Sequence, residues 1–570
     1  MTSKDRLSNS DYFPVIIIGA GLSGIAAGCQ LKTKLGLGRF RIYDRNDGIG
    51  GTWWIHRYPG VACDVPASLY SYSFAQNPSW STLKPSGEEI AAYIQATSDK
   101  FGLSSHIQLN TEVSSLIWDE QKEEWEVSLH QIPSAHGKSP NCSARRSKCS
   151  VRAKIVISAT GKFAVPQTDS IRVPGIETFT GSVLHTARWD ANVNLQDKRV
   201  VVIGAGCSAA QLVPALLRQY NVRSVTQLVR TAPWVSPTLL SSRQLRVWET
   251  YTPWLMQKIP GLSQAVRLVM FLIAELSFFR IFKAGQHYSR ERYESKLRRY
   301  MERNSPSQYR EILTPHYELG CKRLVHDAGW FKALWDPRLH ITDLRLGRVE
   351  KRAVTLTDMR GDYQFAHSHE SKIPADVIIM ATGYDTSSLL HNIHVIGSGS
   401  ATLHDYWTSE GIQAYQGLAV PGFKNLFLLL GPNSSSGHTS VMIGVENSIY
   451  YILKLIKPIL DSEVSCWDIK KESSRVWTES VQKASQESVW VTGRCHSWYV
   501  DDKGWNSAVY PYSMIYNTYR AMFPYWDDWI PRYTNKGIDK QHQRRMLRSG
   551  IYIVLPILLI ALMGLYKLMN

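Results

Sequence analysis

Two glycine-rich loops, each directly after a β-branched run, constrain the fold of this chain more than any other feature. The first holds Gly19, Gly21 and Gly24 between an apolar run and a helical pattern. The second holds Gly204 and Gly206 in the same setting. A strand that ends in such glycines and opens a helix lets the backbone approach a pyrophosphate at the helix N-terminus. The sequence therefore predicts an α/β protein with two Rossmann-like dinucleotide-binding domains.

The residues at the ends of the second strands distinguish the two sites. Asp44 stands twenty residues past the first loop, where a carboxylate can accept hydrogen bonds from a ribose diol. The second unit has a strand pattern at 224–229 that ends in Arg230 and Thr231, with no acid. A guanidinium there suits the 2′-phosphate of NADPH, which a carboxylate would repel. The alternative is that Arg230 is an ordinary surface side chain.

Between the second unit and later strand patterns, residues 234–319 have helical periodicity and are rich in Leu, Trp, Arg and Tyr. We interpret this stretch as a helical insertion. Its most apolar part, 265–282, carries Arg267, Glu275 and Arg280. These charges favour an amphipathic or core helix over a membrane span.

Composition limits the class of partner. The 570 residues carry a formal net charge of +17, but the basic side chains are scattered or form short local groups, so nucleic acid is not expected as a partner. Eight cysteines without a CxxC pattern indicate neither a disulfide framework nor a zinc site, and a reducing compartment is expected. The first fourteen residues are polar and have no apolar signal region, so the folded body of the protein is expected in the cytosol.

The C-terminal part ends in an uncharged apolar run at 550–566, preceded by Arg544, Arg545 and Arg548. At about 1.5 Å per residue the run reaches roughly 25 Å, enough for a thin bilayer such as that of the endoplasmic reticulum. The sequence favours a hydrophobic membrane tail with the arginines on the cytoplasmic side. The alternative is a buried or interfacial terminal helix, which Pro556 and the short length of the run favour.

Two longer patterns resemble a known family. Phe179, Gly181, His185 and Trp189 fit the pattern FxGxxxHxxxW, and Asp190 follows the tryptophan. A second pattern, [AG]GxWxxxx[FY]P[GM]xxxD, is met over residues 50–64. On these residues the chain resembles the class B flavin monooxygenases, and specifically the type I Baeyer-Villiger monooxygenases. The resemblance covers nearly the whole chain, from 15 to about 511.

The resemblance implies an active-site arginine at Arg323 with Asp64 as its orienting partner. A guanidinium beside the flavin stabilises an anionic C4a-peroxide and the tetrahedral adduct that follows. Trp498 resembles a tryptophan that contacts the NADP ribose, although the residues after it depart from the family pattern. The predicted cofactor-binding residues are Gly19, Gly21, Gly24, Asp44, Arg45, Gly51, Thr52, Trp53, Cys63, Asp64, Tyr70, His185, Gly204, Gly206, Cys207, Ser208, Ala209, Arg230, Thr231 and Trp498.

The implied function is that of an FAD- and NADPH-dependent monooxygenase that uses a C4a-peroxyflavin. The expected reaction is Baeyer-Villiger oxidation of a hydrophobic ketone to an ester or lactone with O2, in secondary-metabolite biosynthesis. The alternative is an N- or S-oxygenating flavin monooxygenase on the same scaffold, against which Trp189 and Asp190 argue. A disulfide reductase would need a redox cysteine pair, and Cys29 and Cys63 lack that spacing.

The same reasoning divides the chain into segments. The expected order is an FAD-binding part at 1–165, an NADPH-binding part at 166–232, a helical insertion at 233–322, the rest of the NADPH domain at 323–384, the rest of the FAD domain at 385–540, and a basic flank with membrane tail at 541–570.

Overall fold

The computed structural model describes residues 12–133, 148–163, 165–167, 173–238, 240–283, 285–358, 371–386, 389–390 and 393–543. The predicted membrane tail at 550–566 and the arginines before it lie outside these ranges. Among the helices within them, none combines the length and apolar character that a bilayer span requires.

The first sheet is built around β1 (Tyr12–Ile18), whose last four residues are buried. Its strand order is β17-β4-β5-β6-β1-β2-β3, and β18 also pairs with β6. Strands β1, β2, β3, β6 and β18 run parallel, so their carboxyl ends meet at one edge. The other bounds are β2 Phe40–Tyr43, β3 Ile107–Gln108, β4 Thr111–Asp119, β5 Glu124–Gln131, β6 Lys148–Ser158, β17 His394–Ile396 and β18 Leu426–Leu428.

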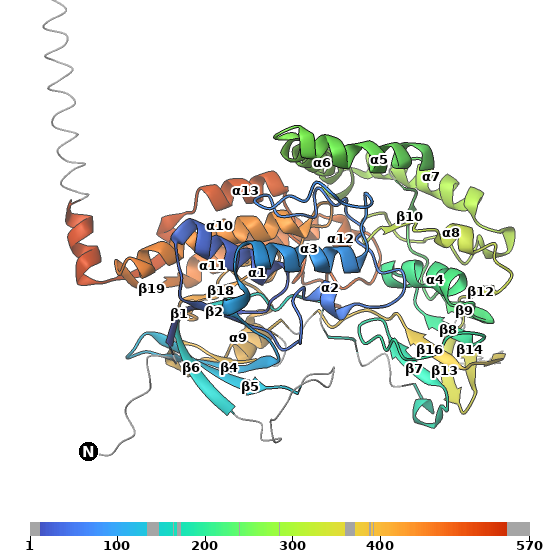
Figure 1. The fold of residues 1–570 in the computed structure, drawn as a ribbon, viewed down its shortest axis with the longest axis horizontal. Coiled ribbons are helices and arrows are strands. Elements are labelled where there is room, and N and C mark those ends of the chain that lie inside the picture. Colours follow the sequence, from blue (N-terminus) through green and yellow to red (C-terminus); the bar gives the residue numbers. More distant parts are fainter. Residues whose placement is uncertain are drawn as a thin grey trace, which may run out of the picture.

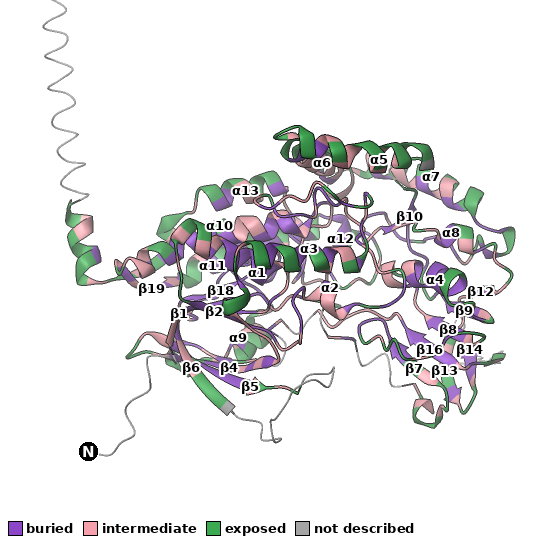
Figure 2. Ribbon diagram, in the orientation of Figure 1, coloured by how far each residue is buried: buried purple, intermediate pink, exposed green. Residues whose placement is uncertain are grey.

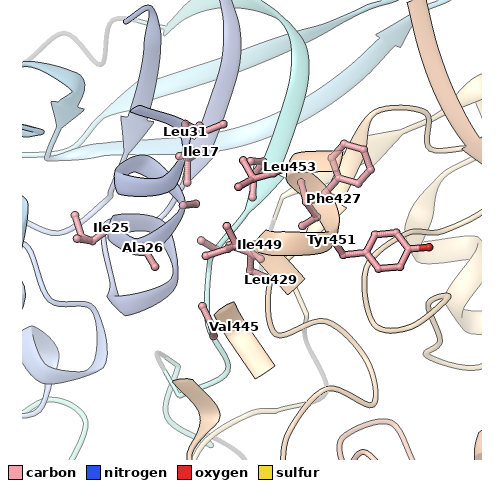
Figure 3. Close-up of a cluster of buried hydrophobic side chains, with 14 of the residues drawn as sticks. Ile17, Ile25, Ala26, Leu31, Phe427, Leu429, Val445, Ile449, Tyr451 and Leu453 are labelled. Atoms are coloured by element: carbon pink, nitrogen blue, oxygen red, sulfur yellow. The ribbon is translucent and has the colours of Figure 1, made fainter. Parts of the chain in front are cut away.

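Helices from both ends of the chain cover this sheet. The glycine loop leads directly into α1 (Leu22–Leu35), and α10 (Val441–Leu460) packs against it. Figure 3 shows Ala26 of α1 near Val445 and Ile449 of α10, with Ile17 of β1 above them in this view. The core of the first domain therefore requires residues more than 400 positions apart in the sequence.

Local signals explain where α3 (Gly87–Lys100) begins. The Ser86 side chain accepts a hydrogen bond from the Glu89 amide and caps the helix. Glu88 and Glu89 lie in the first turn, where negative charge is favoured. The apolar positions Ile90 and Ile94 recur at helical spacing and are fully buried.

The second sheet is parallel throughout, with the order β12-β9-β8-β16-β7. Its central strand β8 (Arg199–Ile203) leads through the second glycine loop into α4 (Cys207–Gln219). Strand β16 (Val377–Met380) returns from much later in the chain to lie between β8 and β7. The other strands are β7 Ser182–His185, β9 Ser224–Leu228 and β12 Leu339–Thr342, and an antiparallel sheet of β13 Arg345–Glu350, β14 Ala353–Thr357 and β15 Ser371–Pro374 lies beside them.

In the sequence, a group of helices separates β10 (Val235–Ser236) from β11 (Val325–His326), two short strands that pair with each other. These helices are α5 Ser242–Lys258, α6 Leu262–Ser277, the π-helical turn η5 Phe278–Phe282 and α7 His287–Asn304. In Figure 1, α5 and α6 lie along the upper side of the molecule together with α13 (Met514–Met522). Figure 2 shows that this side carries many exposed residues.

The remaining elements complete the two units. They are α2 Thr52–Ile55, η2 Ser104–His106, η4 Ile176–Thr178, η6 Ser307–Tyr309, α8 Trp330–Ala333, η7 Ser398–Ser400, α9 Leu403–Glu410, β19 Val464–Ile469, α11 Lys471–Gln486, α12 Val489–Thr492, η8 Trp526–Asp528 and β20 Trp529–Tyr533.

One expectation from the cysteines is wrong. Cys321 and Cys495 form a disulfide between segments 174 positions apart. Such a separation leaves no local spacing signal in the sequence, because only the fold brings the two loops together. The disulfide joins the loop that carries Arg323 to the loop that carries Trp498.

Candidate functional site

A cavity of about 680 Å³ opens at the carboxyl edge of the first sheet. Its size falls in the range of small-molecule and cofactor sites, roughly 300 to 1,000 Å³. The segments that line it include the loop after β1, the end of β2, the start of α2, the start of β4, the end of β5 and the turn after β6. The N-terminal part of α10 closes one side.

The first glycine loop lets the chain fold tightly at this cavity. Gly19 has a φ of +110°, and a Cβ there would lie 2.4 Å from the carbonyl oxygen of Ala159. A Cβ on Gly24 would lie 1.8 Å from the oxygen of Gly19, so this glycine lets α1 sit directly against the loop. Gly21 and Gly51 line the cavity and touch each other closely, with 2.8 Å between the Gly21 Cα and a Cβ built on Gly51. The backbone at the start of α1 thus forms a cradle for an anion such as a pyrophosphate.

Asp44 is held rigidly at the end of β2. Its Oδ2 accepts the Ala20 N–H at 2.6 Å, and its Oδ1 accepts two N–H groups of Asn46 at 2.8 Å. Burial raises the pKa of Asp44, and these hydrogen bonds act in the opposite direction. Both Asp44 and Arg45 line the cavity, where the carboxylate can accept bonds from a ribose diol.

An aromatic wall faces the other part of the cavity. The Trp53 Nε1 donates a hydrogen bond to the Tyr70 hydroxyl at 3.1 Å, and the two rings meet edge to face at 5.7 Å. Burial raises the pKa of Tyr70, so its hydroxyl stays protonated. Thr52, Trp53 and Tyr70 all line the cavity and offer a flat surface for an aromatic ring system.

Asp64 and Arg323 form an ion pair between residues 259 positions apart. The Arg323 Nε and Nη2 both donate to Asp64 Oδ2, at 3.0 and 2.8 Å. Burial raises the pKa of Asp64, but the charge and hydrogen bonds of Arg323, together with smaller contributions from His326 and Lys84, hold that pKa below the ordinary value. The charge of Asp64 raises the pKa of Arg323 in turn. Both groups are therefore charged throughout the physiological range.

The structure places this pair beside the cavity and not in its lining. Asp64 and Cys63, both expected on the flavin, are absent from the lining residues, and Cys63 is buried. The charges of Asp64 and Arg323 reach the hydroxyl of Tyr70, which does line the cavity. Tyr70 therefore lies close to both the ion pair and the cavity.

The second glycine loop repeats the geometry of the first. Gly204 has a φ of +122°, and a Cβ there would lie 2.5 Å from the oxygen of Ala381. Gly206 is the N-cap of α4, and no atom lies within 4 Å of a Cβ built on it, so the space before the helix is open. The next residues, Cys207, Ser208 and Ala209, form the first turn of α4.

The edge beyond β9 is basic. Arg230 and Thr231 are exposed at the end of this strand. Burial lowers the pKa of Lys322, and the charge of Arg230 lowers it further, so the two cations are neighbours. A pair of cations next to an open helix N-terminus is suited to the phosphates of NADPH.

Aromatic side chains connect the two nucleotide loops. Tyr384 contacts the rings of Phe163 at 5.6 Å and His185 at 6.3 Å, and Phe163 contacts Trp498 at 5.4 Å. Burial, together with the charge of Arg188, lowers the pKa of His185 to about 4, so the ring is neutral at pH 7. Its Nδ1 accepts the N–H of Ala187 at 2.9 Å. His185 and Trp498 therefore lie between the two sites, and Phe163 lines the cavity.

Lys162 is a cavity residue that the sequence did not reveal. It lines the cavity, only 6% of it is exposed, and its Nζ lies 3.4 Å from Ser435 Oγ. No carboxylate within the described ranges forms an ion pair with it, and burial lowers its pKa to about 7. The turn that ends at Gly161 is visible in the sequence, but no local pattern marks the next residue as a buried cation.

Comparison with known proteins agrees with this geometry. A model of the flavin-binding monooxygenase-like family matches residues 14–257. A Baeyer-Villiger monooxygenase of Streptomyces coelicolor is 31% identical over 503 residues, 88% of this chain and 89% of its own. The FAD-binding monooxygenase ktnD of Aspergillus niger is 30% identical over 538 residues, 92% of this chain and 83% of its own.

Solved structures share the fold. The polycyclic ketone monooxygenase of the fungus Thermothelomyces thermophila superimposes with a TM-score of 0.75 at 19% identity, covering 93% of this chain and 91% of its own. The cyclohexanone monooxygenase of Rhodococcus sp. Phi1, bound to NADP+, gives a TM-score of 0.73 at 24% identity, with coverage of 92% and 99%.

Proposed function

The chain belongs to the Baeyer-Villiger monooxygenases, which are FAD- and NADPH-dependent flavoenzymes, and we propose that it inserts one oxygen atom of O2 beside the carbonyl of a hydrophobic ketone. The observation that carries the proposal is the half-buried Asp64–Arg323 ion pair near a cavity of cofactor size. The product of this reaction is an ester or a lactone.

The residues of the cavity fit FAD. Gly19 and Gly21, with the start of α1, would hold the pyrophosphate, and Asp44 would accept bonds from the ribose. The wall of Trp53 and Tyr70 would face the flavin ring. When bound, FAD supplies the redox chemistry, taking a hydride from NADPH and transferring one atom of O2 to the substrate.

Arg323 acts as an electrostatic stabiliser. Asp64 takes the donors on Nε and Nη2, and no acceptor in the described part of the chain takes the hydrogens of Nη1. These free donors can stabilise the negative charge that develops on the ketone oxygen when its carbonyl carbon is attacked. Asp64 orients the guanidinium, since two bonds to one carboxylate oxygen restrict its rotation.

Arg230 and Lys322 would bind the phosphates of NADPH at the second loop. Neutral His185 and the rings of Tyr384, Phe163 and Trp498 lie between the loops and restrict water there. Excluding water favours oxygen transfer to the substrate over release of hydrogen peroxide.

Two further parts of the proposal concern the substrate and the location. The apolar side chains of the helices α5 and α6 support a hydrophobic substrate, and secondary metabolism is the setting we propose for it. The apolar run at 550–566, with its arginines, supports a C-terminal membrane anchor that leaves the catalytic body in the cytosol. The endoplasmic reticulum is the bilayer whose thickness suits this run.

The test is a comparison of substrate classes. The purified, FAD-loaded protein is given NADPH and O2 with a polycyclic ketone or with an aryl methyl thioether. Ester or lactone formation that matches NADPH consumption supports the proposal. Sulfoxide formation from the thioether, with no ester from any ketone, would assign the chain to the heteroatom-oxygenating branch.

A further inference from the structure

Helix α6 turns both of its charged side chains inward. The Arg267 guanidinium donates to the backbone oxygen of Leu69 at 3.1 Å and to Glu446 at 3.1 Å. Glu275 accepts a bond from the buried His438 at 2.7 Å and from the Met514 amide at 3.1 Å. Only uncharged side chains of this helix are therefore left for its outer side, and all but a few of them are apolar.

The outer side of α6 is apolar and exposed. Leu268, Val269, Leu272, Ile273 and Leu276 follow one helical face, and each is between 46% and 62% exposed. An isolated exposed leucine is ordinary on a protein surface, but a contiguous apolar face marks an interaction site.

This face continues onto the neighbouring helices. Glu275 also accepts the Ile515 amide at 3.3 Å, so the end of α6 and the start of α13 are joined. Figure 1 shows α5, α6 and α13 on the same side of the molecule. Ten of the exposed large apolar side chains lie between Val247 and Phe279, and five lie between Ile515 and Phe523, on α13 and the residue that follows it. We call these fifteen residues the apolar face: Val247, Tyr251, Trp254, Ile259, Leu268, Val269, Leu272, Ile273, Leu276, Phe279, Ile515, Tyr516, Tyr519, Met522 and Phe523.

The exposed charged side chains on and beside α5 and α6 are basic. Exposed cations on and beside these helices are Arg243, Arg246, Lys258, Arg280 and Lys283. The acidic side chains of the described residues in 241–283 are the partly buried Glu249 and the buried Glu275. Exposed apolar side chains with a basic border are typical of surfaces that lie on anionic lipid.

Aromatic side chains fit the same environment. The apolar face contains Tyr251, Trp254, Tyr516 and Tyr519. Their rings have an apolar body and a polar group, and such side chains concentrate at the boundary between lipid headgroups and hydrocarbon. A protein partner would not require this combination with a basic border.

We propose that the apolar face seats the protein on the surface of an anionic phospholipid bilayer, with its lipid-facing side chains at the level of the headgroups. This proposal is independent of the catalytic assignment and of the C-terminal anchor, since it rests only on residues between 243 and 523.

The test uses the full chain with vesicles of phosphatidylcholine, with or without phosphatidylserine, that contain a lipid-phase photoreactive probe. Peptide mass spectrometry then reads which segments the probe labels. We expect labelling of the peptides that contain Leu268–Leu276 and Ile515–Phe523, and at least about threefold less without phosphatidylserine. Labelling confined to other segments, the C-terminal run included, would overturn the proposal.

A pair of variants checks the same surface by flotation of the vesicles. Leu272→Ser with Ile273→Ser should lower the bound fraction, with a partition coefficient reduced about tenfold or more. The matched control, Ile117→Ser with Val183→Ser, changes two exposed apolar residues on other elements, 38% and 40% exposed, and should leave binding unchanged. Equal effects of the two pairs would also overturn the proposal.

Measurements on the Leu272 and Ile273 variant without lipid distinguish a bilayer from two other occupants of the apolar face, a second copy of the chain and the chain's own C-terminal segment. If a second copy covers it, the Leu272 and Ile273 variant changes the mass measured by light scattering. If the chain's own C-terminal segment covers it, the variant lowers the melting temperature. Either result would refute the bilayer as the occupant, and we expect neither.

Discussion

Replacement of Lys162 by methionine should stabilise the apoprotein and at the same time weaken FAD binding. The lysine is 6% exposed and lies in the cavity without a carboxylate partner in the described residues. A fall of its pKa from 10.5 to about 7 corresponds to about 5 kcal/mol against the charged form. Relaxation and water entry reduce this cost, so we expect Lys162→Met to raise the free energy of unfolding by about 2 to 4 kcal/mol at pH 7.

The pH dependence follows from the direction of the shift. Below about pH 7 the lysine is protonated in both the folded and the unfolded chain, and the full cost of burying the charge applies. Between about pH 7 and pH 10.5 the folded protein loses the proton first, so the cost falls by about 1.4 kcal/mol per pH unit. The difference between the variant and the wild type should therefore shrink as the pH rises through this window.

Urea unfolding of the apoproteins at several pH values measures this difference. Lys503→Met, in an exposed loop, is the matched control and should change the free energy of unfolding by less than about 0.5 kcal/mol. Fluorescence titration with FAD should show an affinity about 10 to 100 times weaker for Lys162→Met, because methionine cannot donate the hydrogen bond that the ammonium in the cavity lining would give to bound FAD. A variant that is more stable but binds FAD normally would refute the reasoning, as would a stability difference that does not vary with pH.

Three further substitutions test the site. Arg323→Ala should leave NADPH-driven reduction of FAD intact and lower ester formation at least about a hundredfold, measured by coupled NADPH and product assays; normal ester yield would remove Arg323 from the reaction. Arg230→Ala should raise the KM for NADPH about tenfold or more and the KM for NADH less than about twofold, and equal changes would exclude a phosphate-binding role. Cys321→Ser should lower the free energy of unfolding by about 2 to 5 kcal/mol, whereas Cys149→Ser, which removes a free and exposed thiol, should not.

The sequence predicts those features that have local signals. The β-branched runs before Gly19 and Gly204 and the glycines themselves identify both strand–loop–helix units, since each unit is contiguous. The position of Asp44 after β2 follows from the same local order. The structure contains both strand–loop–helix units and has Asp44 at the end of β2, and Gly19 and Asp44 line the cavity.

Features that depend on distant segments are less accessible. Nothing local to Asp64 or Arg323 indicates that they meet; only the resemblance to a family pairs them. The burial of Lys162 depends on the loop around Ser435, and the disulfide depends on two loops far apart in the sequence. In each case, tertiary packing decides a property that neighbouring residues do not encode.

Helix α6 shows that a helical sequence pattern does not indicate which side of the helix faces the solvent. Arg267 and Glu275 suggest a helix that turns its charges to water and its apolar side inward. The structure turns both charges inward, because Glu446 and the amide groups of α13 provide partners for them. The apolar side is therefore left on the surface, which the periodicity of the helix alone cannot reveal.

Oxygen-isotope labelling of the product tests the assignment as a Baeyer-Villiger monooxygenase most directly. The FAD-loaded protein is supplied with NADPH, a polycyclic ketone and ¹⁸O2, and the ester is analysed by mass spectrometry. Our account predicts that each ester molecule contains one labelled oxygen atom and that one ester molecule forms for each NADPH consumed. The Arg323→Ala variant should yield almost no labelled ester. Consumption of NADPH with labelled hydrogen peroxide as the only oxygen-containing product, whichever ketone is offered, would contradict it.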